Sequence, residues 1–207
     1  MQALLPKLAV VLPPAGEKLS LDRLFSSLPR QVWLEIGFGA GEHLAEQAAR
    51  HPDTGFIGCE IFLNGIAALL DHVARRGLAN VRIHPDDARV LLDALPDASI
   101  ARAFLLFPDP WPKRRHQDRR FVGPDNLARL ARVLADGAEL VVASDDTGLV
   151  AWTLEHVLRH RDLEWLARRP QDWREKPADW PTTRYETKAV TAGRRPAYLR
   201  FLRRSRS

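Results

Sequence analysis

Short apolar runs alternate with segments of helical spacing along most of this chain. Residues 32–36 form an apolar run that ends in glycines, and residues 42–50 follow with apolar side chains at helical intervals. Residues 100–107 end in an uninterrupted apolar stretch, which is typical of a strand buried at the centre of a parallel sheet. Because parallel strands are joined by right-handed crossovers, the alternation predicts an α/β fold with a three-layer, doubly wound, mostly parallel sheet.

The same pattern predicts where the elements lie. Strands are expected at residues 32–36, 56–60, 81–84, 100–107, 139–143, 163–167 and 198–202. Helices are expected at residues 42–50, 63–76, 86–92, 124–134 and 147–160. Ligands of such sheets bind at the carboxyl ends of the strands, so the residues that follow each strand are the first candidates for a site.

The length of 207 residues is enough for one domain with one core. We expect this domain to span residues 31–207, after an extension over residues 1–30 whose flexibility the sequence leaves open. The single cysteine, Cys59, excludes an internal disulfide and any metal site built from several cysteines. The first residues lack a basic region and are interrupted by Pro6 and Lys7, so we expect a cytoplasmic protein without a membrane segment.

Basic residues are concentrated in the second half of the chain. Residues 1–100 hold 9 Lys/Arg and 12 Asp/Glu, whereas residues 101–207 hold 22 and 14. Such an imbalance is typical of proteins that bind a polyanion. Because 26 of the 31 basic residues are arginine, a bias in genome composition explains the charge as well, and charge alone does not decide between the two.

A glycine-rich turn follows the first predicted strand. Gly37, Gly39 and Gly41 stand at every second position, which lets the backbone approach a ligand beside a helix N-terminus. Glu42 occupies the position where a dinucleotide fingerprint has its third glycine, and Glu35 precedes the turn. Two acids would repel a pyrophosphate, so the turn suits a cationic ligand, although a purely structural turn explains the glycines equally well.

Acidic residues also follow the next three predicted strands. Glu60 ends the second strand, at the distance where a carboxylate accepts hydrogen bonds from ribose hydroxyls. Asp86 and Asp87 follow the third strand, from where a side chain can reach an adenine amino group. Either aspartate could instead cap a helix, and we favour that interpretation for Asp86. Asp109 follows the fourth strand at the sheet centre. Acids over one crevice match S-adenosylmethionine, which carries a ribose, an adenine and a positive sulfonium.

A loop rich in proline and arginine follows the fourth strand and reads FPDPWPKRRHQDRRF over residues 107–121. Pro108 and Pro110 restrict the backbone on both sides of Asp109. Trp111 is either a stacking platform for a base or a buried anchor. His116 suits a hydrogen bond to phosphate or backbone better than catalysis. The basic side chains are expected to contact RNA phosphates, or else to be only a solvated surface: Lys113, Arg114, Arg115, Arg119 and Arg120.

Five motifs in this order resemble the bacterial tRNA (guanine-N7-)-methyltransferases: LEIGFGAGEHL, GCEI, DDA, FPDPWPKRRHQDRR and TTRYE. The resemblance implies a Rossmann-like class I methyltransferase fold, S-adenosylmethionine as methyl donor and a guanine in the variable loop of tRNA as acceptor. It implies cofactor binding by Glu35, Glu60, Asp87 and Asp109, with Asp109 also catalytic. It implies substrate binding by Lys113, Asp145, Thr183, Arg184, Tyr185 and Glu186.

Two positions depart from the pattern of that family. Arg184 stands where lysine is common, and Asp146 stands where an aromatic residue is usual. Two other functions remain open: a methyltransferase of the same fold that acts on a small molecule or a protein, and an RNA-binding domain without activity. The oligomeric state is not predicted.

Two weaker signals lie in the second half of the chain. His156 and His160 are four residues apart on a predicted helix, but no third ligand has a suitable spacing, so no metal site is predicted. Trp165, Trp173 and Trp180 accompany many arginines in a segment that either orders on binding RNA or packs under a long loop.

Overall fold

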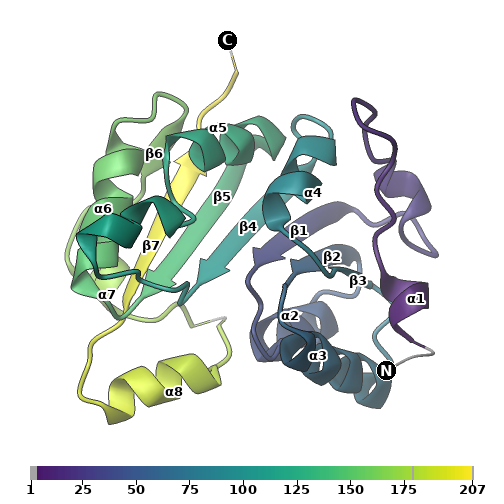
Figure 1. The fold of residues 1–207 in the computed structure, drawn as a ribbon, viewed down its shortest axis with the longest axis horizontal. Coiled ribbons are helices and arrows are strands. Elements are labelled where there is room, and N and C mark those ends of the chain that lie inside the picture. Colours follow the sequence, from purple (N-terminus) through teal and green to yellow (C-terminus); the bar gives the residue numbers. More distant parts are fainter. Residues whose placement is uncertain (1–3, 179, 207) are drawn as a thin grey trace.

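The computed structural model describes residues 4–178 and 180–206. Its centre is a seven-stranded sheet with the order β3-β2-β1-β4-β5-β7-β6, in which only β7 runs antiparallel to the others (Figure 1). The strands are β1 Gln31–Ile36, β2 Thr54–Cys59, β3 Val81–His84, β4 Ile100–Leu106, β5 Leu134–Ser144, β6 Leu163–Trp165 and β7 Ala197–Arg203. The strand order reverses between β1 and β4, where the carboxyl ends of the parallel strands border a crevice. The predicted α/β class and its seven-stranded, mostly parallel sheet are confirmed.

Helices cover both faces of this sheet (Figure 1). α4 (Ala88–Ala94), α5 (Pro124–Val133) and α6 (Thr147–Leu158) pack on one face, and α2 (Glu42–Arg50) and α3 (Leu63–Arg76) pack on the other. Each face has its own apolar core, which includes Leu91, Leu130 and Val157 on the first face and Leu44, Leu69 and Val73 on the second. Across residues 4–178 and 180–206, none of the helices has the length and apolar character that crossing a membrane requires.

Capping residues set the ends of two helices near the crevice. α3 ends at Gly77, whose φ of 62° lies in the left-handed region that glycine adopts without strain. α4 begins after Asp87, whose side chain accepts a hydrogen bond from the Arg89 amide at 2.9 Å. The interpretation of Asp86 as the helix cap is therefore wrong: its carboxylate accepts from the Asp87 amide at 2.7 Å, and Asp87 is the cap.

Residues 4–30 pack along the edge of the sheet. After α1 (Leu5–Leu8), the Val10 amide donates to the Ile83 carbonyl of β3 at 2.8 Å. Val10, Leu19 and Phe25 are buried in the apolar cores, on either side of the 3-10 turn η1 (Leu21–Arg23). This segment therefore shares the core of the sheet, and the domain boundary at residue 30 remains a prediction.

Two short helices that the sequence analysis did not predict lie between β6 and β7: α7 (Gln171–Arg174) and α8 (Arg184–Thr191). The Thr183 side chain accepts from the Glu186 amide at 3.2 Å, so the overlooked signal was the T-x-x-E capping pattern. Trp180 is buried in the core beside α2, which supports the interpretation that the tryptophans of this segment pack against the protein.

Candidate functional site

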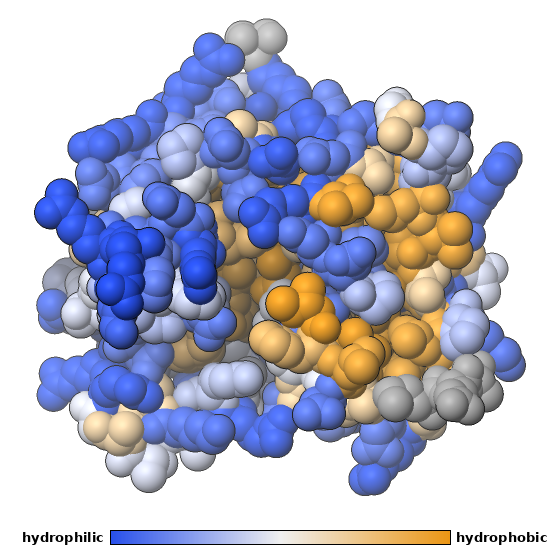
Figure 2. Space-filling view, viewed as in Figure 1, coloured by the Kyte–Doolittle hydropathy of each residue, from blue (hydrophilic) through white to orange (hydrophobic). Residues whose placement is uncertain are grey.

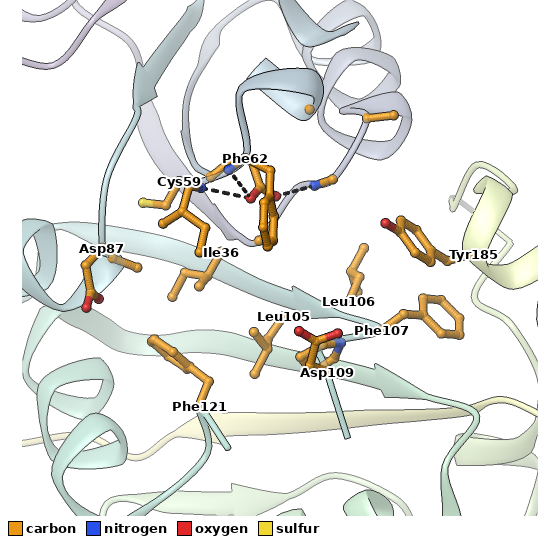
Figure 3. Close-up of a pocket in the computed structure, with 18 of the residues that line it drawn as sticks. Ile36, Cys59, Phe62, Asp87, Leu105, Leu106, Phe107, Asp109, Phe121 and Tyr185 are labelled. Carbon is orange, nitrogen blue, oxygen red and sulfur yellow. Dashed lines mark hydrogen bonds between the residues drawn. The ribbon is translucent and has the colours of Figure 1, made fainter. Parts of the chain in front are cut away.

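A cavity of about 500 Å³ opens at the carboxyl ends of β1, β2 and β4. Ile36 and Leu105 form its floor, Asp87 lies at one end, and Asp109 and Tyr185 lie at the other (Figure 3). This volume falls within the range of roughly 300–1,000 Å³ that is usual for small-molecule sites. The topology therefore places the cavity where the alternating sequence pattern predicts a ligand.

The two rims of the cavity differ in chemical character. Ile61 and Phe62, which precede α3, are 61% and 64% exposed and line one wall. Arg119, at the end of the 3-10 helix η2 (Arg114–Arg119), also lines the cavity. Figure 2 shows the surface hollowed near its centre, with strongly hydrophilic residues on the left and an apolar patch on the right. A cavity with both apolar and cationic lining suits a small ligand that is bound next to a polyanion.

The Glu60 carboxylate organises the glycine-rich turn. It is 7% exposed, and its two oxygens accept from the backbone amides of Gly39 at 2.9 Å, Ile61 at 2.8 Å and Phe62 at 3.0 Å (dashed in Figure 3). A carboxylate offers about four acceptor positions. Room for about one further donor is therefore left on Glu60, fewer than the two ribose hydroxyls that the sequence analysis considered.

The glycines of the turn have different roles. Gly37 and Gly39 line the cavity with φ of 69° and 57°. Gly41 lies behind it, because a Cβ there would come within 2.8 Å of the Leu69 side chain. Gly65 of α3 was missed by the sequence analysis: a Cβ there would lie 2.2 Å from the Gly39 carbonyl oxygen. The signal that could have identified Gly65 is its position as an isolated glycine inside a helical pattern.

Glu35 does not reach the cavity in this structure. Its carboxylate is 2.7 Å from Nδ1 of His43, and both side chains are buried on the α2 side of the sheet, where the His43 ring contacts Phe104 and Trp180. Strand alternation explains this, since Ile36 points to the opposite face and lines the cavity. A direct contact of Glu35 with a cofactor remains a prediction.

Asp87 lies at the cavity end near β3 and is paired with an arginine. Both of its oxygens are within 3.0 Å of Nε of Arg89, and Nη2 of Arg89 is 2.8 Å from Oδ2. Partial burial raises the pKa of Asp87, but the hydrogen bonds from Arg89 outweigh it, so the pKa is lower than usual. Asp87 is therefore ionised at neutral pH and available as an acceptor.

Asp109 is held in a strained segment between β4 and η2. Phe107 and Trp111, two residues before and after it, have φ of 51° and 42°, in the left-handed region that side chains rarely adopt. The Phe107 amide donates to the Ala143 carbonyl of β5 at 2.8 Å, which anchors one end of the segment. Asp109 is exposed, and its carboxylate points into the cavity (Figure 3). Strain of this kind is typical of functional sites.

The cations of this loop fall into two groups. Lys113, Arg114, Arg115 and Arg119 are exposed and form no ion pair with any acid among the described residues, so they are free to meet phosphates. Arg120 is 7% exposed and donates to the Pro110 carbonyl, so it is not presented to phosphates in this structure, and its role as a phosphate contact stays a prediction. The ring of Trp111 lines the cavity with the Arg119 guanidinium 4.8 Å away, which leaves its stacking role open.

Helix α8 forms the wall beside the glycine-rich turn. Tyr185 lines the cavity at 51% exposed, and Arg184 pairs with Glu42 of α2 at 2.6 Å. Thr183 and Glu186 are buried; Glu186 accepts from the Tyr198 hydroxyl at 2.6 Å and supports the helix from behind. Of the other predicted substrate residues, Lys113 does not line the cavity, and Asp145 pairs with Arg194 at 2.7 Å.

Comparisons with known proteins agree with this geometry. Residues 29–198 match the profile of a family described as "Putative methyltransferase". The tRNA (guanine-N(7)-)-methyltransferase of Rhodospirillum rubrum is 53% identical over 209 residues, which cover 100% of this chain and 82% of the relative. The protein of the same name from Agrobacterium fabrum is 50% identical over 204 residues, with 99% and 88% covered.

The chain belongs to the tRNA (guanine-N7-)-methyltransferase family. Solved structures confirm the class I methyltransferase fold at low sequence identity. An rRNA methylase from Streptococcus thermophilus superposes with a TM-score of 0.58 at 13% identity, covering 84% of this chain and 87% of that one. A putative methyltransferase from Streptococcus mutans, solved in complex with SAH, gives 0.55 at 9% identity, with 84% and 89% covered.

Two features of the described residues indicate which kind of cofactor this methyltransferase could bind. No group of three or more His, Cys, Asp or Glu side chains in residues 4–178 and 180–206 is arranged to hold a metal ion. His156 instead makes a 2.8 Å hydrogen bond to the Trp152 carbonyl. The cavity lining combines four acids, a glycine-rich backbone and apolar walls, which fits a cationic nucleoside.

Proposed function

We propose that this methyltransferase transfers a methyl group from S-adenosylmethionine to N7 of a guanine in the variable loop of tRNA. The observation that carries the proposal is the cavity between Glu60, Asp87 and Asp109, which opens beside the exposed cations of η2. A small-molecule methyltransferase would have little use for an open cationic rim. A binding domain without activity would have little use for an acid held in the cavity by a strained segment.

The two ends of the cavity suit different parts of the donor. Glu60 has acceptor capacity left for a ribose hydroxyl, and Asp87 has carboxylate oxygens that suit an adenine amino group. Ile36 and Leu105 provide apolar floor for the planar base. Asp109, at the other end, is the acid that a sulfonium and an incoming guanine would share.

The chemistry needs positioning and charge stabilisation rather than a strong base. Guanine N7 has a lone pair and no proton, and the donor supplies a methyl carbon whose bond to sulfur breaks with its electron pair going to sulfur. Positive charge then spreads over the purine. The Asp109 carboxylate stabilises that charge or holds the guanine by its amino edge, and no proton has to leave.

Methylation of unmodified tRNA, followed by nucleoside mass spectrometry, tests this proposal. We expect 7-methylguanosine with wild-type tRNA and none with a transcript whose variable-loop guanine is replaced by adenosine. Calorimetry should show binding of S-adenosylmethionine and not of NAD. A methyl group found on another nucleoside, on a protein or on a small molecule, or no uptake of the donor, would contradict the proposal.

Because the cations of η2 are exposed, we expect tRNA binding to depend on salt. Changing Arg114 and Arg115 to alanine should raise KM for tRNA and reduce the slope of log affinity against log salt by about 1 to 2, because each phosphate contact contributes about one counterion. Arg159 and Arg161 are 76% and 93% exposed after the far end of α6 and form a matched control. An equal effect of both double changes would show that the η2 cations are only solvated surface.

A further inference from the structure

Arg120 is a buried arginine without an acid partner among the described residues. The residue is 7% exposed, whereas its neighbour Arg119 is exposed at the cavity. Burying a cation is costly unless its donors are hydrogen-bonded. The interactions of the buried guanidinium must therefore offset that cost.

The side-chain hydrogen bonds that Arg120 forms with described residues reach the segment that carries Asp109. Nε donates to the Pro110 carbonyl at 2.8 Å, and Nη2 donates to the Trp111 carbonyl at 3.5 Å. Pro110 directly follows Asp109 in the chain. One rigid guanidinium thus ties down two successive peptide units, which a flexible ammonium group cannot do in the same way.

The guanidinium is itself held in place. It lies 4.9 Å from the ring centroid of Trp152 on α6, and the Trp152 indole donates to the Val122 carbonyl at 2.5 Å. Arg120 therefore connects the loop to a helix of the rigid core.

The loop requires such a support. Phe107 and Trp111 both have positive φ, and strained conformations of this kind cost roughly 1–3 kcal/mol each and persist only where surrounding contacts determine them. The Phe107 amide is anchored to Ala143, on the β4 side of Asp109. Arg120 anchors the other side. Asp109 thus lies between two fixed points.

We propose that Arg120 is a positioning residue that holds the Asp109 carboxylate in the cavity through the Pro110 and Trp111 carbonyls. The proposal rests on the proposed methyl transfer and assigns Arg120 no contact with tRNA. Arg119 is expected to act differently, because its side chain faces the cavity rim and the Trp111 ring.

Steady-state kinetics of Arg120→Met and Arg119→Met separate the two roles. For Arg120→Met we expect a roughly 10- to 100-fold lower kcat, the size of effect that a misplaced group produces, with KM for tRNA and its salt dependence unchanged. Arg119→Met should instead raise KM for tRNA and flatten the salt dependence. A rise in KM with a flatter salt slope for Arg120→Met would overturn the proposal and make Arg120 a phosphate contact.

A double-variant cycle excludes a merely structural role. In the Asp109→Ala background, Arg120→Met should lower kcat by less than about 2-fold more, since its effect acts through the missing carboxylate. If Arg120→Met lowered kcat by the same factor in the Asp109→Ala background as in the wild type, the proposal would be contradicted. Arg120→Lys supplies the same comparisons if Arg120→Met does not fold, and it should be intermediate in kcat. If the wild-type enzyme does not methylate tRNA, the proposed function fails before any variant is compared.

Discussion

Replacing Asp109 with alanine should lower kcat for tRNA methylation by roughly 100- to 1,000-fold, the loss typical of removing one preorganised electrostatic group from a transition state. The carboxylate is exposed in the cavity between two strained residues. In the proposed mechanism it stabilises the positive charge that develops on the purine. Because the side chain is exposed, the melting temperature should change little. Single-turnover methylation with saturating tRNA measures the expected loss.

Asp118 provides the matched control for this prediction. It is an exposed acid of η2 on the same loop and does not line the cavity. Asp118→Ala should keep kcat within about 2-fold, since surface changes of this kind have small effects. Asp109→Asn distinguishes the two roles of the carboxylate, because an amide retains an acceptor for a guanine amino group but carries no charge. A near-normal rate for Asp109→Ala would show that the acid has been misassigned.

Changing Gly65 to alanine should weaken binding of S-adenosylmethionine by at least 10-fold and lower the free energy of unfolding by about 1–3 kcal/mol, as overpacking does. The new Cβ would lie 2.2 Å from the Gly39 carbonyl oxygen and 3.2 Å from Cγ of Glu60, so the turn at the cavity wall would have to retreat. Helix propensity alone predicts the opposite sign, since alanine is favoured over glycine inside a helix by roughly 0.5–1 kcal/mol. Calorimetry and urea unfolding measure the two quantities.

Gly123→Ala serves as the control for a glycine with free space. A Cβ at Gly123 meets no described atom within 4 Å, and the residue has extended backbone before α5. Its free energy of unfolding should change by less than about 1 kcal/mol, and donor affinity should not change. If Gly65→Ala proved as stable as the wild type and bound the donor normally, α3 would not pack against the turn as closely as the structure indicates.

Local sequence patterns were sufficient for most of the fold. Two helices have the predicted limits, α2 at Glu42–Arg50 and α3 at Leu63–Arg76, because their apolar spacing is regular and Gly77 ends the second. Strand β5 begins earlier than predicted, at Leu134, because Leu134 pairs with Ile100 at the start of β4. This early part was not predicted because Asp136 and Gly137 are not typical of a strand. Helix α8 was missed because it is short and mostly polar, so the capping pattern of Thr183 and Glu186 was its main signal.

The candidate site was only partly predictable. Acids at strand ends could be found because the parallel topology brings those ends together, and the structure places Glu60, Asp87 and Asp109 in one cavity. The direction of a side chain within a strand was harder to judge, so Glu35 was expected at the cavity but is paired with His43 on the other face. Gly65 and Arg89 also line the cavity but were not predicted. Gly65 packs against Gly39, which is distant in the sequence, and Arg89, the partner of Asp87, lies just outside the DDA motif.

What the sequence by itself determined is the order of the elements, the family and the acids at the ends of the strands, because these follow from periodicity and motifs that are local in the chain. Only the tertiary structure decided which of two adjacent arginines, Arg119 and Arg120, faces the cavity and which supports the Asp109 loop. The two have the same side chain and are adjacent in the sequence. Their roles differ because burial and hydrogen bonding are set by Trp152 and the Pro110 carbonyl, which only the folded chain brings within reach.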